Sequence, residues 1–136
     1  PAVPDLKRAL TDSHSEVRKT SAASLGRLWP VASSAVPALV RCLTDARQDV
    51  RRNAAEALGM FGEHAARTLP ALQERVRDKS SDVRKAAAEA IGQLGGDAAA
   101  AVPVLTELLN DSNEHVRDAS AAALLQISRG GSSPRR

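Results

Sequence analysis

The chain has 136 residues, a formal net charge of +3, and one tryptophan, one phenylalanine and no tyrosine. So few aromatic rings are unusual for a globular core of this length, whereas small side chains let helices approach closely, which favours an all-helical stack. The charge is too small to indicate nucleic-acid binding as the main function, and the single cysteine, Cys42, excludes an internal disulfide and a multi-cysteine zinc site.

A unit of 33 residues is written four times, with no insertion or deletion between copies. Self-similarity at this period is typical of a solenoid, in which each unit buries its apolar side against its neighbours. The sequence therefore predicts an all-α fold, a right-handed α-solenoid of four stacked antiparallel helical hairpins. We expect one domain over residues 1–129, with repeats at 3–35, 36–68, 69–101 and 102–129, and a polar, basic tail over 130–136.

In the first repeat, Pro4 follows an apolar residue and suits the first turn of a helix, where a missing N–H has no consequence. The second helix of this repeat carries an apolar stripe at three- and four-residue spacing, formed by Val17, Ser21, Ser24, Leu25 and Leu28. Trp29 and Pro30 come next. We expect Trp29 to pack under the following loop or against the second repeat, and the alternative is an exposed anchor for a partner.

The second and third repeats show the pattern most clearly. In the second, we expect a first helix from Pro37 to near Asp45, and a second helix from about Gln48 to Phe61 that Gly62 ends. Second helices contain a glycine in three repeats, at Gly26, Gly59 and Gly92. A glycine inside a helix costs about 1 kcal/mol relative to alanine. Its recurrence predicts close contact with an adjacent helix.

The fourth repeat differs at its end. Leu125 stands where the other repeats have glycine, and the segment 128–134 is rich in serine, glycine and proline. This composition predicts that the last helix stops near Ser128 and that a polar tail follows.

Two charged residues recur in every repeat, an aspartate and an arginine six residues after it. Because a ligand site needs no fourfold copy, we expect these pairs to be structural. Each carboxylate is expected to cap a second helix or to contact a guanidinium of its own or the neighbouring repeat. The predicted structural ladder consists of Asp12, Arg18, Asp45, Arg51, Asp78, Arg84, Asp111 and Arg117.

Each repeat combines an apolar-Pro first helix, this Asp and Arg spacing, and a second helix related to Val-Arg-x-x-Ala-x-x-Ala-Leu-Gly, which is clearest in the segments 49–59 and 82–92. With these motifs the chain resembles a HEAT-repeat protein, in particular the short, regular subtype also found in phycobilisome lyases. The resemblance extends over residues 3 to about 128. It implies that first helices form the convex side of the stack and that second helices line the concave side.

Positions on the exposed side of the second helices are then the candidate binding surface. Lys19, Arg52 and Lys85 are expected to form a row of three cations, one per repeat, which Asp118 interrupts. The alternative for this row is a solvated face whose cations pair with neighbouring glutamates. The candidate partner-binding residues are Lys19, Arg27, Arg52, Asn53, Glu56, Met60, Lys85, Glu89 and Gln93.

We therefore expect a non-enzymatic scaffold that binds a protein or peptide with some acidic surface. The first alternative is that the basic row binds nucleic acid or another polyanion, and the second is a chaperone or lyase-like role, as the phycobilisome resemblance implies. No catalytic residue or cofactor is expected, because the sequence shows neither a glycine-rich phosphate loop nor a Ser-His-Asp arrangement. No metal site is expected, because His14, His64 and His115 occupy different repeat positions and stacking does not align them. Without a signal peptide or transmembrane segment, we expect a cytoplasmic protein with no membrane contact. An apolar N-terminal end predicts further repeats or self-association.

Overall fold

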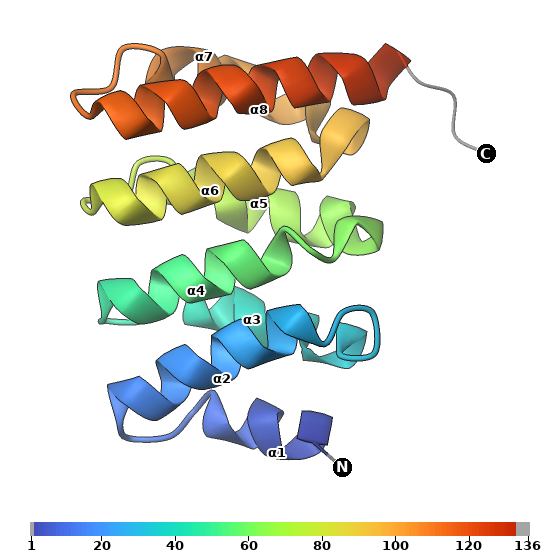
Figure 1. Ribbon diagram of the computed structural model, residues 1–136, viewed down its shortest axis with the longest axis vertical. Coiled ribbons are helices and arrows are strands. Elements are labelled where there is room, and N and C mark those ends of the chain that lie inside the picture. Colours follow the sequence, from blue (N-terminus) through green and yellow to red (C-terminus); the bar gives the residue numbers. More distant parts are fainter. Residues whose placement is uncertain (1, 133–136) are drawn as a thin grey trace.

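A computed structural model describes residues 2–132, which hold eight α-helices and no β-strand. The helices pair into four antiparallel hairpins, and the hairpins stack in a single file (Figure 1). The first helices of the hairpins are α1 (Ala2–Ala9), α3 (Val36–Cys42), α5 (Ala65–Arg75) and α7 (Val102–Leu108). The second helices are α2 (Ser15–Arg27), α4 (Gln48–Leu58), α6 (Ser81–Gln93) and α8 (Glu114–Ser132). This architecture confirms the predicted α-solenoid.

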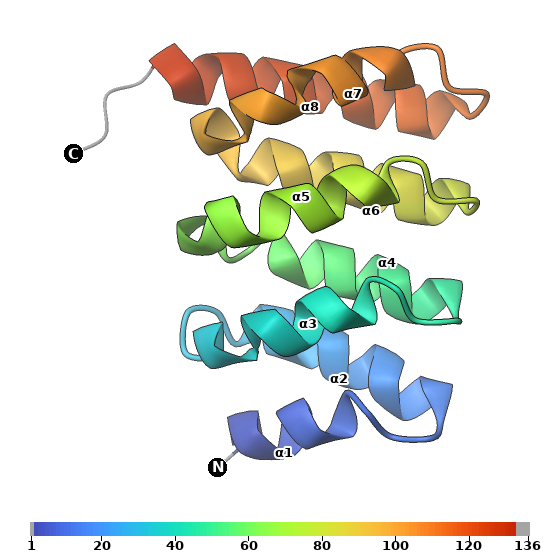
Figure 2. The ribbon, with the colours of Figure 1, turned by 180° about the vertical axis from the view of Figure 1, so that it is seen from behind.

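Two layers result from the stacking. The second helices face the viewer in Figure 1, and the first helices face the viewer when the molecule is seen from behind (Figure 2). Short 3-10 helices lead from α2, α4 and α6 to the next hairpin, and they are η1 (Ser33–Ala35), η2 (Gly62–His64) and η3 (Gly95–Ala101). Gly95 has a φ of 66°, a left-handed conformation that ends α6 and that glycine adopts without strain.

The prolines mark the first helices, but not always at their start. Pro37 and Pro103 lie in the first turn of α3 and α7, as predicted. Pro70 instead lies inside α5, which begins at Ala65. The additional turn buries Ala65 and Thr68, and this burial offsets the hydrogen bond that the proline removes.

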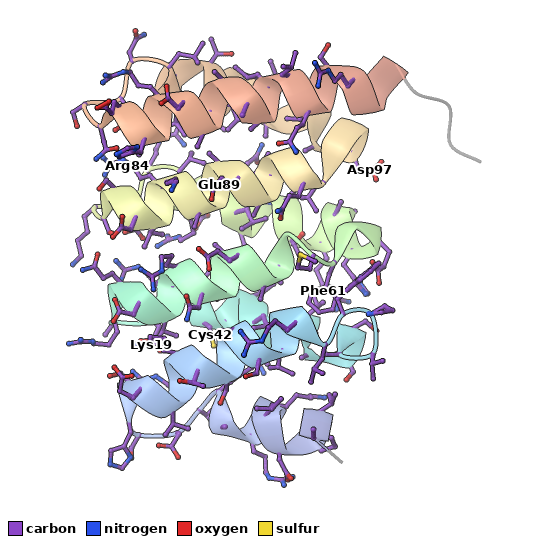
Figure 3. The ribbon with its side chains drawn as sticks, viewed as in Figure 1. Lys19, Cys42, Phe61, Arg84, Glu89 and Asp97 are labelled. Carbon is purple, nitrogen blue, oxygen red and sulfur yellow. The ribbon has the colours of Figure 1, made fainter. Side chains whose placement is uncertain are left out.

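The core lies between the two layers and consists of aliphatic side chains with one aromatic ring. Phe61, labelled in Figure 3, is fully buried just after α4. The largest aliphatic side chains with no exposed surface are Leu25, Leu39, Leu58, Leu72, Ile91 and Leu105. Each comes from the apolar stripe of a different helix, so the core runs through the whole stack.

Glycine sets the distance between successive second helices. A Cβ atom added to Gly26 would lie 2.9 Å from the Cα of Ala57, and one added to Gly59 would lie 3.0 Å from the Cα of Ala90. At Gly92 the corresponding distance to the Cα of Ala123 is 2.9 Å. These separations are shorter than carbon atoms tolerate, so each junction requires glycine. The predicted close contacts are confirmed.

The last helix is longer than predicted. α8 continues through Gly130 to Ser132, so the expected helix end near Ser128, and a tail beginning at residue 130, are placed too early. The reason is packing, because the backbone of Gly130 lies against Gly95 and Gly96 at the start of η3. A helix can pass this point only without a side chain. The remaining part of the predicted tail, 133–136, lies outside the described residues.

Trp29 lies at the junction between the first two hairpins. Its indole Nε1–H donates a hydrogen bond of 3.2 Å to Oε1 of Glu63 in the second repeat. The ring is about half exposed, and this bond joins it to the second repeat.

Candidate functional site on the second-helix face

The repeated arginines join each hairpin to the next one. Arg51 donates two parallel hydrogen bonds to Asp78, from Nε to Oδ2 and from Nη2 to Oδ1, each 2.9 Å long. Arg18 contacts Asp45 in the same way, at 2.8 and 3.1 Å, and Arg84 contacts Asp111 at 2.9 and 3.1 Å. Each pair is 27 residues apart and crosses a junction between repeats. The paired bonds set the distance and the rotation between hairpins.

The third nitrogen of each arginine holds the turn of its own repeat. Nη1 of Arg51 donates to the backbone carbonyl of Asp45 at 2.8 Å and to that of Ala46 at 3.2 Å. The aspartates are oriented as well, because Oδ1 of Asp78 accepts the backbone N–H of Ser80 at 2.9 Å. One arginine thus connects the turn before its own helix to the turn of the next hairpin.

Burial strengthens the central pair of this ladder. The side chains of Arg51 and Asp78 are only 6% and 2% exposed. Burial alone would raise the pKa of the Asp78 carboxyl, but the hydrogen bonds from Arg51 and from the N–H of Ser80 outweigh it, and the pKa lies below its ordinary value. The same balance lowers the pKa values of Asp45 and Asp111.

The exposed surface of α2, α4, α6 and α8, called here the second-helix face, carries the predicted binding residues. Figure 3 shows two of them, Lys19 on α2 and Glu89 on α6. Two neighbouring hollows, of about 230 and 280 Å³, indent this face, and both are lined by Glu56 of α4. Together they extend across three successive helices.

The first hollow lies between α2 and α4. Its lining combines small side chains with the longer ones of Met60 and Arg27. Its lining residues are Ala23, Gly26, Arg27, Asn53, Glu56, Ala57 and Met60. Asn53 also connects the two helices, because its Nδ2 donates a hydrogen bond of 3.1 Å to the backbone carbonyl of Lys19. Periodicity did not reveal this contact, since no other repeat has asparagine at the position.

The second hollow lies between α4 and α6 and is more polar. It is lined by Arg52, Glu56, Asp82, Lys85, Ala86 and Glu89. Partial desolvation raises the pKa of the Glu56 carboxyl, Arg52 and Lys85 oppose this effect, and Glu89 adds to it. The hollow is therefore lined by charges of both signs.

The three cations of the predicted row differ in their partners. Lys19 Nζ lies 3.1 Å from Oε1 of Glu16, and Lys85 Nζ lies 4.0 Å from Oε2 of Glu89. Arg52 donates only a 3.4 Å hydrogen bond to Oδ1 of Asn53, and within residues 2–132 it forms no ion pair. Of the nine predicted binding residues, Lys19 and Gln93 line neither hollow.

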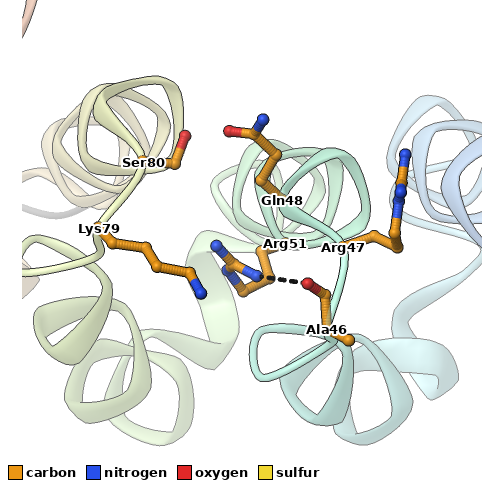
Figure 4. Close-up of a pocket in the computed structure, with 6 residues that line it drawn as sticks. All are labelled: Ala46, Arg47, Gln48, Arg51, Lys79 and Ser80. Carbon is orange, nitrogen blue, oxygen red and sulfur yellow. Dashed lines mark hydrogen bonds between the residues drawn. The ribbon is translucent and has the colours of Figure 1, made fainter.

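A further hollow of about 400 Å³ lies at the tight turns before α4 and α6 (Figure 4). It is lined by Ala46, Arg47, Gln48, Arg51, Lys79 and Ser80. Arg51 is engaged there by the ladder, and its bond to the Ala46 carbonyl is drawn in Figure 4. The sequence did not indicate this hollow, because Arg47 and Lys79 occupy turn positions that change from repeat to repeat.

Groups that could support metal or thiol chemistry are not assembled in the described part of the chain. Among residues 2–132 no three His, Cys, Asp or Glu side chains come together as a metal site would require. Cys42 is buried, its Sγ lies 4.0 Å from the carbonyl oxygen of Leu10, and burial raises the pKa of its thiol. No helix in this range has the length and apolar character needed to cross a bilayer.

Comparison with known families agrees with this geometry. The profile of the HEAT repeats family matches residues 3–92 and, in a second alignment, residues 36–126. A stack of helical hairpins with this profile over almost its whole length defines the class, and the protein belongs to the HEAT-repeat family. A search of curated protein sequences gave no significant match.

Solved structures share the fold. An engineered protein superimposes with a TM-score of 0.83 and 27% identity over 96% of this chain and 64% of its own. The complex of CpcE and CpcF of phycocyanin lyase from Nostoc sp. PCC7120 gives a TM-score of 0.68 at 23% identity, over 93% and 65% of the two chains. Computationally designed armadillo repeat proteins for modular peptide recognition give 0.74 at 25%, over 93% and 64%. The chain thus spans slightly less than two thirds of the length of each of these three structures.

Proposed function

We propose that this protein is a non-enzymatic scaffold that binds a segment of another protein along the second-helix face. The observation that carries the proposal is the pair of adjoining hollows that meet at Glu56 and extend from α2 to α6. A surface indented across three helices suits an extended or helical segment, which contacts several repeats in succession.

The chemistry of the two hollows suggests the character of that segment. Arg27 donates a hydrogen bond to the neutral Ser24 hydroxyl at 3.2 Å, and neither Arg27 nor Arg52 has a carboxylate within ion-pair distance in residues 2–132. Met60 lines the first hollow together with Arg27 and is about half exposed. The expected ligand therefore presents an apolar side chain to Met60 and carboxylates to Arg27 and Arg52.

The nucleic-acid alternative has weaker support, because Glu16 and Glu89 partly neutralise two cations of the row. The similarity to designed proteins made for modular peptide recognition supports a peptide ligand. The ion-pair pattern supports acidic residues in it.

The test is a selection from a displayed peptide library on the unmodified chain, followed by affinity measurements with the selected peptides. The double variant Arg27→Glu/Arg52→Glu is expected to lose roughly tenfold or more in affinity, because two favourable charge contacts become repulsive. The matched control is Arg41→Glu/Arg67→Glu, which makes the same charge change at exposed positions of the first helices α3 and α5.

Equal losses of affinity in both variants, or selected peptides whose affinity neither variant changes, would contradict binding on the second-helix face. Binding of an unrelated DNA duplex that weakens steeply with salt would assign it to polyanions instead.

A further inference from the structure

We propose that the N-terminal end of the stack is a docking surface for one more helical hairpin of the same repeat class, and that Leu125 closes the C-terminal end to such a hairpin. The inference concerns the ends of the stack and does not depend on the second-helix face. The N-terminal end surface is defined here by Leu6, Asp12, Val17 and Ser24, which are all at least partly exposed.

The three junctions within the chain show what covers such a surface. At each junction, an arginine of the preceding hairpin forms two bonds to an aspartate of the following one. A glycine eight residues after that arginine contacts an alanine of the following second helix. A valine of the following second helix is fully buried, as found for Val50, Val83 and Val116. A hairpin with Arg and Gly at this spacing is thus the natural occupant.

The N-terminal end has the aspartate, the valine and the small residue that a preceding hairpin would contact. Asp12 has the same turn geometry as the internal aspartates, with Oδ1 accepting the backbone N–H of His14 at 2.8 Å, but within residues 2–132 no arginine bonds to its carboxylate and its side chain is 39% exposed. Val17 is 38% exposed, while its three internal counterparts are fully buried. Ser24 holds the repeat position of Ala57, and its side chain is small enough for the glycine of a docked hairpin to pack against it.

The C-terminal end has the arginine and the apolar residue that a following hairpin would contact, but it lacks the glycine. Nη1 of Arg117 bonds to the Asp111 carbonyl at 2.7 Å, and in the described residues its guanidinium has no carboxylate partner. Leu109 is 39% exposed, whereas its counterparts Leu10, Leu43 and Val76, which a following hairpin covers, are at most 3% exposed. Leu125, however, replaces the glycine, and at that position even a Cβ would come within about 3 Å of the next helix backbone. No further hairpin can stack there in the same geometry.

A second copy of this chain does not satisfy the N-terminal end. The C-terminal end of such a copy would supply Arg117 but would bring Leu125 against Ser24, and its N-terminal end presents Asp12 to Asp12. The occupant is therefore a HEAT hairpin that has both the arginine and the glycine.

The test replaces Pro1 and Ala2 with a copy of residues 36–68, so that the copy directly precedes Val3. The added arginine then precedes Asp12 by the same 27 residues that separate Arg51 from Asp78. Urea unfolding is expected to show a higher midpoint than that of the unextended chain. Asp12→Ala should lower the midpoint clearly in the extended chain and little in the parent, and removing the added arginine should abolish this difference. A matched extension with leucine in place of the added glycine should give no such coupling.

The test at the C-terminal end first replaces residues 128–134, which extend α8, with the connecting residues 62–68, and then adds the same copy in the 33-residue period. We expect no rise in the midpoint until Leu125→Gly is introduced. Hydrogen exchange provides a second measurement, because docking should slow amide exchange in α1 and α2, whereas an undocked addition should not. Absence of both the Asp12 coupling and the added protection from exchange would overturn the proposed docking surface. Equal stabilisation by a hairpin at the C-terminal end with Leu125 present would overturn the proposal that Leu125 closes that end. A dimer of the unextended chain in sedimentation velocity that Asp12→Arg dissociates would assign the surface to a second copy instead.

Discussion

Arg51 and Asp78 belong to different hairpins and form two parallel hydrogen bonds of 2.9 Å between side chains that are almost fully buried. Arg75 adds a third contact, from Nη1 to Oδ2 of Asp78 at 3.0 Å. Because every polar atom of this carboxylate has a partner, its burial is compensated. The pair therefore holds the middle junction of the stack.

Removing one member of this pair should be far more damaging than removing its counterpart at the end of the ladder. We expect Arg51→Ala to lower the free energy of unfolding by about 3–5 kcal/mol, because Asp78 stays buried without its main partner. Arg117→Ala, which loses only a bond to a backbone carbonyl, should lower it by about 1 kcal/mol or less. Urea unfolding of the two variants checks this difference. Similar losses would mean that the arginines act through local packing and not across the junction.

Acid should destabilise the stack through the same aspartates. The pKa values of Asp45, Asp78 and Asp111 are lower in the folded chain than the value of about 3.9 for an unfolded aspartate. Their contribution to stability is therefore complete above about pH 4 and is lost as the pH falls through the folded pKa values. Unfolding midpoints measured from neutral pH down to pH about 2 should show this loss, and the triple Asn variant at these positions should show much less of it. Asp118→Asn, an exposed change on α8, should leave the acid dependence as it is in the unmodified chain.

Gly59→Ala tests the close contact between α4 and α6. Gly59 directly follows α4 and keeps helical backbone angles, and alanine in a helix interior is more favourable than glycine by about 1 kcal/mol. At Gly59, however, the new Cβ would meet the Cα of Ala90 at 3.0 Å and the side chain of Gln93. We expect a net destabilisation of about 1–3 kcal/mol from this overpacking.

Gly62→Ala is the control for this variant, since nothing lies within 4 Å of the added Cβ and the residue has no left-handed φ. It should be neutral or slightly stabilising. Thermal unfolding of both variants separates the steric effect from helix propensity. A stabilised Gly59→Ala protein would show that the junction can widen without loss.

The thiol of Cys42 should react slowly in the native protein. It is buried, and burial together with the negative charge of Asp45 raises its pKa. We expect an aromatic disulfide reagent at mildly alkaline pH to modify the folded chain at least ten times more slowly than the chain in denaturant. Equal rates would indicate that the first junction opens readily.

The sequence allowed the hairpins and their order to be predicted, because units that repeat every 33 residues and carry apolar stripes bury those stripes by stacking in chain order. It could not tell which carboxylate each arginine contacts. Arg51 is six residues from Asp45 and 27 from Asp78, and only the stacking distance, set by Gly59, decides for Asp78. The end of α8 was missed for a similar reason, since the Gly130 contact with Gly96 overrides the weak helix propensity of the segment.

The candidate site was less predictable than the fold. Periodicity places Lys19 and Lys85 on one face, but it does not show that each cation reaches a glutamate on its own helix. Side-chain pairing of this kind depends on rotamers and on residues that differ between repeats. The two hollows depend on the same unrepeated details, notably Met60 and Asn53.

Trp29, the sole indole of the chain, is bound across the seam between the first and second hairpins to Glu63. Its fluorescence therefore reports on that seam alone, while circular dichroism averages over all eight helices. In a linear array whose units interact only with their neighbours, the two signals need not change together on heating. The difference between the midpoints of the two melting curves would measure how independently the first hairpin unfolds.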